Sequence, residues 1–471
     1  MLINNLKIAM RNFKKRKEYA LLNILGLSIG MVCCLFIFRY VSYERSFENF
    51  NPKKTDIVRL RLDYYQNEKM SWQSATIYPA IGPTMKKDFP EVENFCRLHD
   101  AEMLLSNDER PIKFGETKGY FADPASVSML KINLVKGKEE NVLDAPYKLI
   151  LSESTAKKYF GDEEPVGKRL VNRSSTATTV FEVTGVFKDY PGNSHLDIEY
   201  LAAYKTLQKL ADDQPGGDSL NSTETSFGWY DFYTYLQLKP GTDLKKFESK
   251  FPAFCDRYIN SQEFSKANDI KNSLYLLPLK DIHLQSHFNQ EAEVNDNGQS
   301  VAFLFMIAFF IIAIAWINYI NLATARFIER AKEVGVRKVM GALRSSPINQ
   351  FMTESFILNI SALFIAVVAM FLLNPLFAGF TGIPAEAPLF PMPVYIIGFM
   401  AMFITGTFLS GLYPAIVLSA FQPITVLQGI FKNSARGLVL RRGLIVGQFA
   451  TSVILIAGTI IVYQQVKNLE N

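Results

Sequence analysis

Five apolar stretches constrain this chain more than any other feature of its sequence. A membrane-spanning helix takes about 20 predominantly apolar residues, and each stretch is long enough to supply them. A polar segment, residues 42–298, separates the first stretch from the second. The pattern predicts a membrane protein with an α-helical transmembrane region of five spans and one large domain inserted between spans 1 and 2. The predicted spans are 19–41, 299–323, 351–376, 393–418 and 444–465.

The basic residues gather on one side of the predicted spans. The net charge of +5 is small for 471 residues, so its placement is more informative than its size. Lys and Arg are concentrated in residues 1–18, 324–350 and 419–443, whereas the short segment 377–392 holds none. Short loops that stay in the cytoplasm carry an excess of Lys and Arg. We therefore expect a multi-pass protein with its N-terminus inside and the domain at 42–298 outside.

The segment before the first span, residues 1–18, has its apolar residues at helical spacing, with Leu6, Met10 and Phe13 among them. A basic amphipathic helix of this kind lies in the plane of the membrane interface, in contact with lipid. The basic clusters are short and adjacent to spans, which argues against nucleic acid as a partner. The first span is too long for the apolar region of a signal peptide, and no small-residue cleavage site follows it.

The large polar segment shows mixed strand and helix patterns, which predict an α+β domain. Residues 148–160 indicate a strand, a cap at Ser152 or Ser154, and a helix that Gly161 ends. Asp, Gly, Ser and Asn in 212–224 indicate a mobile loop. The other predicted elements are strands at 56–64, 178–190 (bent at Gly185) and 232–238, and a helix from 243 that ends at its proline within 243–259.

The most informative short segment follows the second span. A charged helix is predicted to leave the membrane near Thr324 and to continue to about Met340, and Gly341 allows a turn. A second helix begins around Ser345, with Pro347 suited to its first turn. Periodicity alone leaves two interpretations open for this elbow, residues 324–350: a solvated connector, or a docking site for a cytoplasmic partner.

The run ERAKEVGVRKVMGA (329–342) resembles the signature of the FtsX/MacB-like permease subunits of ABC transporters, the type VII architecture. In that family a Glu-(Ile/Val)-Gly-(Ile/Val)-Arg-(Lys/Arg) run, then Gly-Ala, follows the second transmembrane helix and leads into the coupling helix that contacts the ATPase. Segments 151–170, 183–201, 277–286 and 410–429 resemble further family segments in the same order. The positions that match the signature are Glu333, Val334, Gly335, Val336, Arg337, Lys338, Gly341 and Ala342.

The resemblance implies a permease subunit that is not itself an enzyme and holds no cofactor or metal. A cytoplasmic ABC ATPase would hydrolyse ATP, and the chain would pass its motion to a MacB-like periplasmic core domain at 42–298, for mechanotransmission or efflux. A bacterial inner-membrane location is implied, with a periplasmic adaptor or outer-membrane channel as further partners. The residues expected to couple to the ATPase are Glu329, Arg330, Glu333, Val334, Gly335, Arg337, Lys338, Gly341 and Ala342.

The span count differs from the simple pattern of the family. Simple members have four transmembrane helices, and larger members have eight in two halves. The five spans here resemble a first half followed by the first helix of a second half, at 444–465. The resemblance therefore leaves a homodimer and a second permease half open as partners. It does not name the cargo.

Several patterns imitate catalytic or metal sites. Residues 161–169 resemble a phosphate-binding P-loop, but five residues separate Gly161 from Gly167 where a P-loop has four. Arg169 also follows Lys168 where a P-loop needs Ser or Thr. The Gly-x-Ser-x-Gly of residues 26–30 lies inside a span, where small residues at this spacing favour helix packing. His283 and His287 form a possible metal pair without an evident third ligand, on a segment that the resemblance predicts to be exposed.

Cys96 and Cys255 could form a disulfide in an oxidising compartment, although two unpaired thiols are the simpler interpretation. Two other functions stay open beside the permease. One is a membrane-anchored extracytoplasmic sensor or scaffold that works without an ATPase. The other is an anchored hydrolase, for which no nucleophile–base pair is evident.

Overall fold

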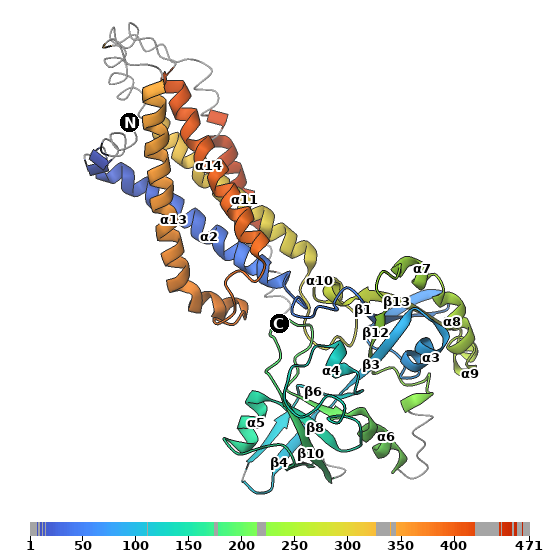
Figure 1. The fold of residues 1–471 in the computed structure, drawn as a ribbon. Coiled ribbons are helices and arrows are strands. Elements are labelled where there is room, and N and C mark those ends of the chain that lie inside the picture. The colour runs from blue at the N-terminus through green and yellow to red at the C-terminus, as the bar shows by residue number, and fades with distance from the viewer. Residues whose placement is uncertain are drawn as a thin grey trace. The chain divides into compact units, whose positions relative to one another are not determined.

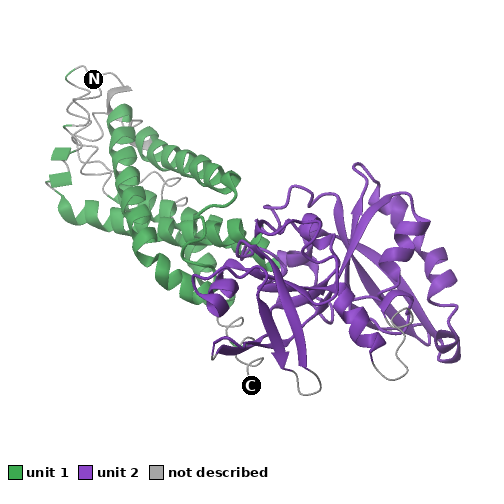
Figure 2. Cartoon of the chain, turned by 60° about the horizontal axis from the view of Figure 1, so that its bottom comes forward, with its two compact units in different colours: residues 1–45, 299–471 green, residues 46–298 purple. Residues whose placement is uncertain are grey.

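A computed structural model describes residues 7, 10–11, 13–14, 16–110, 112–173, 178–213, 223–325, 340, 345–419, 442–443, 445–454, 456–458 and 464. The chain divides into two compact units, coloured separately in Figure 2. We call residues 1–45 and 299–471 the helical unit, and residues 46–298 the sheet unit. The predicted loop at 212–224 lies largely outside the described residues, as does the segment 419–443.

The helical unit is built from long apolar helices that run alongside one another (Figure 1). Within the described residues, four helices are long and apolar enough to cross a membrane. The predicted fifth span is described only in part, as a shorter apolar helix at Ile445–Gly458. The four long helices are α2 (Lys17–Glu44), α11 (Gly298–Ala325), α13 (Ser345–Thr381) and α14 (Pro393–Ser419).

The core of the helical unit lies where α2, α11, α13 and α14 meet. Leu27, Met31 and Phe38 of α2 are buried there against Ala362 and Phe403. Lipid-facing positions of the same helices are apolar and exposed, as Phe364 is at 69%. A helix that is apolar on all sides is expected in a bilayer, because the lipid replaces water as its solvent.

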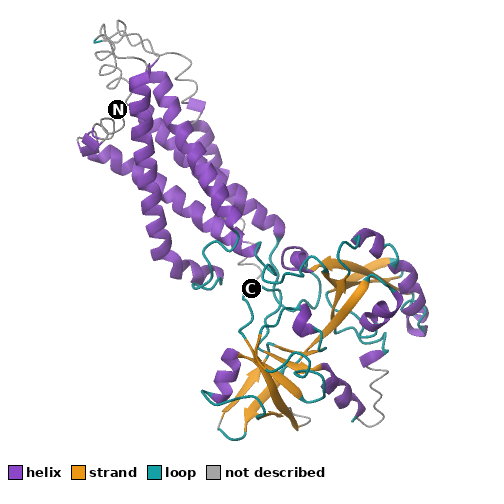
Figure 3. Ribbon diagram, in the orientation of Figure 1, coloured by secondary structure: helices purple, strands orange, loops and turns teal. Residues whose placement is uncertain are grey.

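The sheet unit contains one mixed sheet flanked by short helices (Figure 3). Its main path runs β13-β1-β12-β3-β6-β11-β8-β10-β9-β4-β5, and β2 and β7 pair with β1 and β10. The pairs β10–β8 and β11–β6 are parallel, and the other pairs are antiparallel. The predicted membrane protein with a large α+β domain is therefore confirmed.

The strands fall into two groups, which are distinct in Figure 1 and which we call lobes. The first lobe has its own buried core, with Leu60, Leu236 and Phe247 among its members, and the core of the second includes Leu149 and Phe160. A third cluster, with Leu98, Leu201 and Tyr235, lies where the lobes join.

The first lobe consists of β1 (Ile57–Gln66), β2 (Lys69–Ser74), α3 (Ile81–Asp88), β3 (Val92–Asp100), β12 (Tyr233–Leu238), α7 (Leu244–Glu248), α8 (Phe251–Tyr258), α9 (Glu263–Ala267) and β13 (Ile270–Pro278). The second consists of β4 (Met103–Asn107), β5 (Ile112–Glu116), β6 (Gly119–Ala122), β7 (Leu134–Lys136), β8 (Lys148–Ser152), α5 (Glu153–Phe160), β9 (Arg169–Arg173), β10 (Thr178–Phe187), β11 (Tyr200–Ala203) and α6 (Tyr204–Asp212). Two short helices, α4 (Ser126–Met129) and α10 (Ile282–Gln285), complete the unit.

Local sequence signals predict several of these elements correctly. Ser152 caps α5, because its side chain accepts a hydrogen bond from the Thr155 backbone N–H, and Gly161 follows the helix with a φ of 62°. The pairing of β10 with β8 shifts register between Val183 and Gly185, at the predicted bend. The helix predicted to run from 243 to its proline is present but ends earlier, at Glu248, and a second helix, α8, begins with Pro252 in its first turn.

Candidate coupling site

The nine residues predicted to contact an ATPase, from Glu329 to Ala342, all lie outside the described residues. Within 326–344 only Met340 is described, and it is 81% exposed. The structure therefore describes this site through the helices that flank it. We call the end of the helical unit where α11 ends at Ala325 and α13 begins at Ser345 the elbow end.

The first turns of α13 carry a set of buried polar side chains. Gln350, Glu354, Ser355 and Asn359 are each at most 6% exposed, in a helix that is otherwise apolar over most of its length. Polar groups inside a membrane protein face other helices, because in lipid they would lack hydrogen-bond partners. The set therefore marks the side of α13 that is held against its neighbours.

Two of these side chains, Ser355 and Asn359, have partners on α11. The hydroxyls of Tyr319 and Ser355 are 2.5 Å apart, and the Trp316 indole donates to the Asn359 side-chain oxygen over 3.3 Å. Within α13, the Gln350 amide donates to the Glu354 carboxylate over 3.3 Å. Two hydrogen bonds thus join the last turns of α11 to the first turns of α13, on either side of the elbow.

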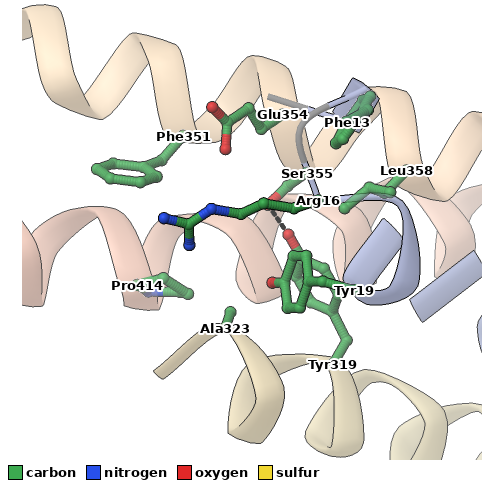
Figure 4. A pocket seen from close by; sticks show the side chains of 10 residues that line it. All are labelled: Phe13, Arg16, Tyr19, Tyr319, Ala323, Phe351, Glu354, Ser355, Leu358 and Pro414. Carbon is green, nitrogen blue, oxygen red and sulfur yellow. Dashed lines mark hydrogen bonds between the residues drawn. The ribbon is translucent and has the colours of Figure 1, made fainter. Parts of the chain in front are cut away.

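A small cavity lies at the elbow end, lined by residues from all four long helices and from the segment before α2 (Figure 4). Arg16 crosses this cavity in Figure 4, with its guanidinium between Phe351 and Pro414 and the Glu354 carboxylate above it in this view. The cavity volume of about 30 Å³ leaves room for about two or three water molecules. It is too small for a nucleotide or an exported molecule, so it is a gap in the helix packing. The lining residues are Phe13, Arg16, Tyr19, Tyr319, Ala323, Phe351, Glu354, Ser355, Leu358 and Pro414.

Sequence reasoning missed the buried polar set of α13. The sequence nevertheless contains a signal for this set: two pairs of polar residues, each four positions apart, at the start of an apolar stretch. The pairs are Gln350 with Glu354 and Ser355 with Asn359. Residues four apart lie on the same side of a helix.

The Gly-x-Ser-x-Gly pattern in α2 is a packing feature. A Cβ at Gly30 would stand 2.8 Å from the Cβ of Ala315, so the glycine permits close approach of α2 and α11. The Ser28 hydroxyl donates to the backbone carbonyls of Ile24 and Ala362, over 2.6 and 3.2 Å. These contacts occupy the hydroxyl with backbone and give it no general base, as the sequence predicts.

The segment that imitates a phosphate loop is also structural. Lys168 pairs with Glu163, and the Gly167 N–H donates to the Val183 carbonyl over 2.8 Å. Hydrogen bonds from Lys168 and Arg110 lower the pKa of Glu163. The lysine and the glycine amide that a phosphate would need are therefore already used.

The two histidines differ in burial, and the two cysteines lie in different hydrophobic clusters. His283 is 6% exposed and stacks on Phe47, with ring centroids 3.3 Å apart, whereas His287 is exposed. The prediction of an exposed segment is wrong for His283, because its ring fills a place in the domain interior. The described residues contain no cluster of three metal-binding side chains. Cys96 and Cys255 are free thiols in separate clusters, and burial raises the pKa of Cys255 to about 11.

Comparison with known proteins gives two family matches that together span most of the chain. Residues 20–254 match the MacB-like periplasmic core domain, and residues 305–423 match the FtsX-like permease C-terminal domain. An ABC transporter permease of Bacillus subtilis (strain 168), YvrN, is 21% identical over 449 residues, which are 91% of this chain and 100% of that protein.

Two further relatives each match about half of this chain. The macrolide export ATP-binding/permease protein MacB of Aggregatibacter actinomycetemcomitans is 24% identical over 228 residues, 47% of this chain and 29% of that protein. A solved permease domain from Porphyromonas gingivalis is 20% identical, with a TM-score of 0.42, and covers 54% of this chain and 98% of that domain. With both family domains present in order, and with apolar helices flanking a large inserted domain, this chain belongs to the FtsX/MacB-like permease family of ABC transporters and is a multi-pass membrane protein with an extracytoplasmic domain.

Proposed function

We propose that this chain is the transmembrane subunit that couples ATP hydrolysis by a separate cytoplasmic ATPase to movement of its extracytoplasmic domain. The ATPase contacts the elbow at 324–350, and the N-terminus lies on the same, cytoplasmic side, in the inner membrane of a bacterium. Three basic segments on one side of the spans support this orientation.

The observation that carries the proposal is the way α13 is held at the elbow end. This helix has 37 residues and is about 55 Å long at 1.5 Å per residue, longer than the roughly 30 Å hydrocarbon core of a bilayer. Its first turns are joined to α11 by the Tyr319–Ser355 and Trp316–Asn359 hydrogen bonds. A push on the elbow therefore moves α11 and α13 together, and α11 is continuous in sequence with the extracytoplasmic domain.

Within the elbow we assign two roles. The charged residues Glu329, Arg330, Glu333, Arg337 and Lys338 orient the ATPase through charge-assisted hydrogen bonds. Gly335, Gly341 and Ala342, together with Val334, allow close backbone approach and the turn. The family relationship suggests further partners: a periplasmic adaptor, an outer-membrane channel, and a second permease half or copy of this chain. Export of a macrolide-like cargo, as in the name of MacB, is one candidate activity.

The test is purification of the tagged full chain from its native membranes with identification of the associated proteins. We expect an ATPase in stoichiometric amount, lost in the double variant Arg337→Glu/Lys338→Glu. A matched double reversal in the other basic loop, Lys432→Glu/Arg436→Glu, changes the same charge on the same side and should retain the ATPase. Retention by both variants would refute the assigned coupling residues. Intact wild-type protein without any ATPase would favour the sensor or scaffold function.

A further inference from the structure

A buried carboxylate, Glu48, follows directly after the first membrane helix. The helix α2 ends at Glu44, and Glu48 lies four residues further on, inside the sheet unit. Its side chain is almost completely buried, and its backbone has a φ of 60°. A residue other than glycine in this left-handed region costs free energy, so the surrounding contacts must hold it there.

The contacts of Glu48 on one side come from the loop 188–199, which joins β10 to β11 in the second lobe. One carboxylate oxygen, Oε1, accepts from the Ser194 hydroxyl at 2.6 Å, from the His195 backbone N–H at 2.9 Å and contacts His195 Nδ1 at 2.7 Å. The Glu48 N–H donates to the Asn193 carbonyl over 3.0 Å. The Asn193 amide in turn donates to the Ser46 carbonyl over 3.0 Å. The chain leaving α2 is thus tied to this loop by backbone and side-chain hydrogen bonds together.

The other side of the network reaches the first lobe. His195 Nε2 lies 2.7 Å from the Tyr235 hydroxyl, and Tyr235 is fully buried on β12. Tyr235 pairs with Arg59 of β1 on one side and with Cys96 of β3 on the other, so it lies on an interior strand of that lobe, with its side chain in the cluster where the lobes join. Glu48, His195 and Tyr235 therefore form one continuous buried path that joins the chain leaving α2 to the loop 188–199 of the second lobe and to strand β12 of the first.

We propose that Glu48 is the positioning residue through which displacement of the chain leaving α2 changes the angle between the two lobes. This inference rests on the proposed function and specifies where membrane motion enters the domain. Glu48 can transmit a displacement because of the number and type of its contacts. Hydrogen bonds to a charged acceptor are short and strong, and in a buried site water does not replace them when they are strained. A force on residues 46–48 is therefore passed to the loop and to β12 at the same time.

The experiment measures two distances in the full chain in lipid nanodiscs with its co-purified ATPase. Cys33, the exposed one of the four cysteines, is replaced by Ser. One spin-label pair, Lys17→Cys and Ala325→Cys, reports the elbow end. The other pair, Lys113→Cys on β5 and Lys266→Cys on α9, reports the separation of the lobes, and all four positions are exposed. Each distance is measured without nucleotide and after trapping with ATP and vanadate.

In the wild type both distances are expected to change on trapping. In Glu48→Gln the elbow-end distance should still change, while the change between the lobes falls to less than half. The matched control is Glu93→Gln. Glu93 of β3 accepts from Gln237, two residues after Tyr235 on β12, over 2.9 Å, and it is not one of the three residues of the Glu48–His195–Tyr235 path. This control should behave as the wild type. A merely structural role of Glu48 would not separate the two responses in this way.

Each other outcome decides between the claims. A full lobe response in Glu48→Gln overturns the role of Glu48, and so does a wild type in which only the elbow end responds. No response at either pair in the wild type refutes the proposed function itself. If Glu48→Gln fails to fold, Tyr235→Phe is measured in its place, because this substitution removes only the hydroxyl that contacts His195. We expect it also to reduce the change in distance between the lobes. An undiminished change in Tyr235→Phe overturns the proposal.

Discussion

Gly406 of α14 lies directly against the indole of Trp316 on α11, so closely that a Cβ at this glycine would stand 2.0 Å from the ring atom Cζ2. The same tryptophan donates to Asn359 of α13 over 3.3 Å. One indole therefore connects three membrane helices near the elbow end. Close approach of this kind is typical of membrane helices, which associate through small residues and a few polar contacts because water does not drive them together.

Gly406→Ala is expected to destabilise the helical unit by about 1–3 kcal/mol, the usual cost of overpacking an interior site. The rigid indole cannot yield as the end of a flexible side chain would, so α11 and α14 must separate. Thermal unfolding of the purified chain in detergent measures the effect. Gly398→Ala on the same helix is the control, because its Cβ would be 4.0 Å from the nearest atom, on Phe38. Equal stability of the two variants would contradict the packing described here.

The Tyr319–Ser355 hydrogen bond is expected to stabilise the pairing of α11 with α13 by about 0.6 kcal/mol, the average for such bonds between membrane helices, and by no more than about 1.7 kcal/mol. The cycle of Tyr319→Phe, Ser355→Ala and the double variant isolates it, since each single change removes the same bond. Denaturant titration in detergent supplies the free energies of unfolding. A coupling energy of zero would show that the two hydroxyls are close without stabilising each other.

The elements of the sheet unit that could be predicted from sequence depend on local chemistry. Ser152 and Gly161 bound α5 because a hydroxyl cap and a left-handed residue are properties of single positions. The burial of His283 could not be predicted in this way, because the ring on which it stacks belongs to Phe47, far away in the sequence. The same limit applies to Glu48, whose partners His195 and Tyr235 become neighbours only in the folded sheet.

The candidate coupling site shows a different limit. The charged residues of the elbow were identified by resemblance to a family, and the spans by their hydropathy. Neither signal concerns the buried polar residues of α13, since an average over an apolar stretch conceals single polar positions such as Asn359. Only the contacts with Trp316 and Tyr319 show that these residues hold the helices on either side of the elbow together.

Arg97 is a buried cation that Asp123 stabilises. The residue is 3% exposed, and its guanidinium donates to the two Asp123 carboxylate oxygens over 2.9 and 3.1 Å. Burial alone would lower the pKa of Arg97, but the charge of Asp123 more than offsets this and raises it. A second carboxylate, that of Glu224, also contacts the Arg97 guanidinium at 3.1 Å. Asp123→Ala removes the carboxylate that makes two of these hydrogen bonds and is expected to cost at most about 3–5 kcal/mol, the penalty for leaving a buried charge without any partner.

The matched control for this pair is exposed. Lys118 and Asp197 form an ion pair with side chains 47% and 44% exposed. Asp197→Ala should change the free energy of unfolding by less than about 1 kcal/mol, as for most surface pairs. Urea titration followed through Trp72 and Trp229 of the sheet unit compares the two variants. Similar losses in both would show that burial does not govern the strength of the Arg97 pair.

The buried carboxylate of Glu48 gives the domain a defined dependence on pH. Burial by itself would raise the pKa of Glu48, but the charge of His195 and the hydrogen bonds from His195 and Ser194 outweigh it, so the pKa is lowered. A carboxyl group whose pKa is lower in the folded state stabilises the fold above its unfolded value of about 4.3 and loses this contribution as the pH falls through the folded value. The contribution of the Glu48 carboxylate to the stability difference between wild type and Glu48→Gln should therefore be lost as the pH falls below about 4.3. Urea titrations of the full chain at each pH measure it. A difference that already disappeared between pH 7 and 5 would mean that Glu48 is protonated in the folded domain near neutrality, and the network would then be held by hydrogen bonds to a neutral acid.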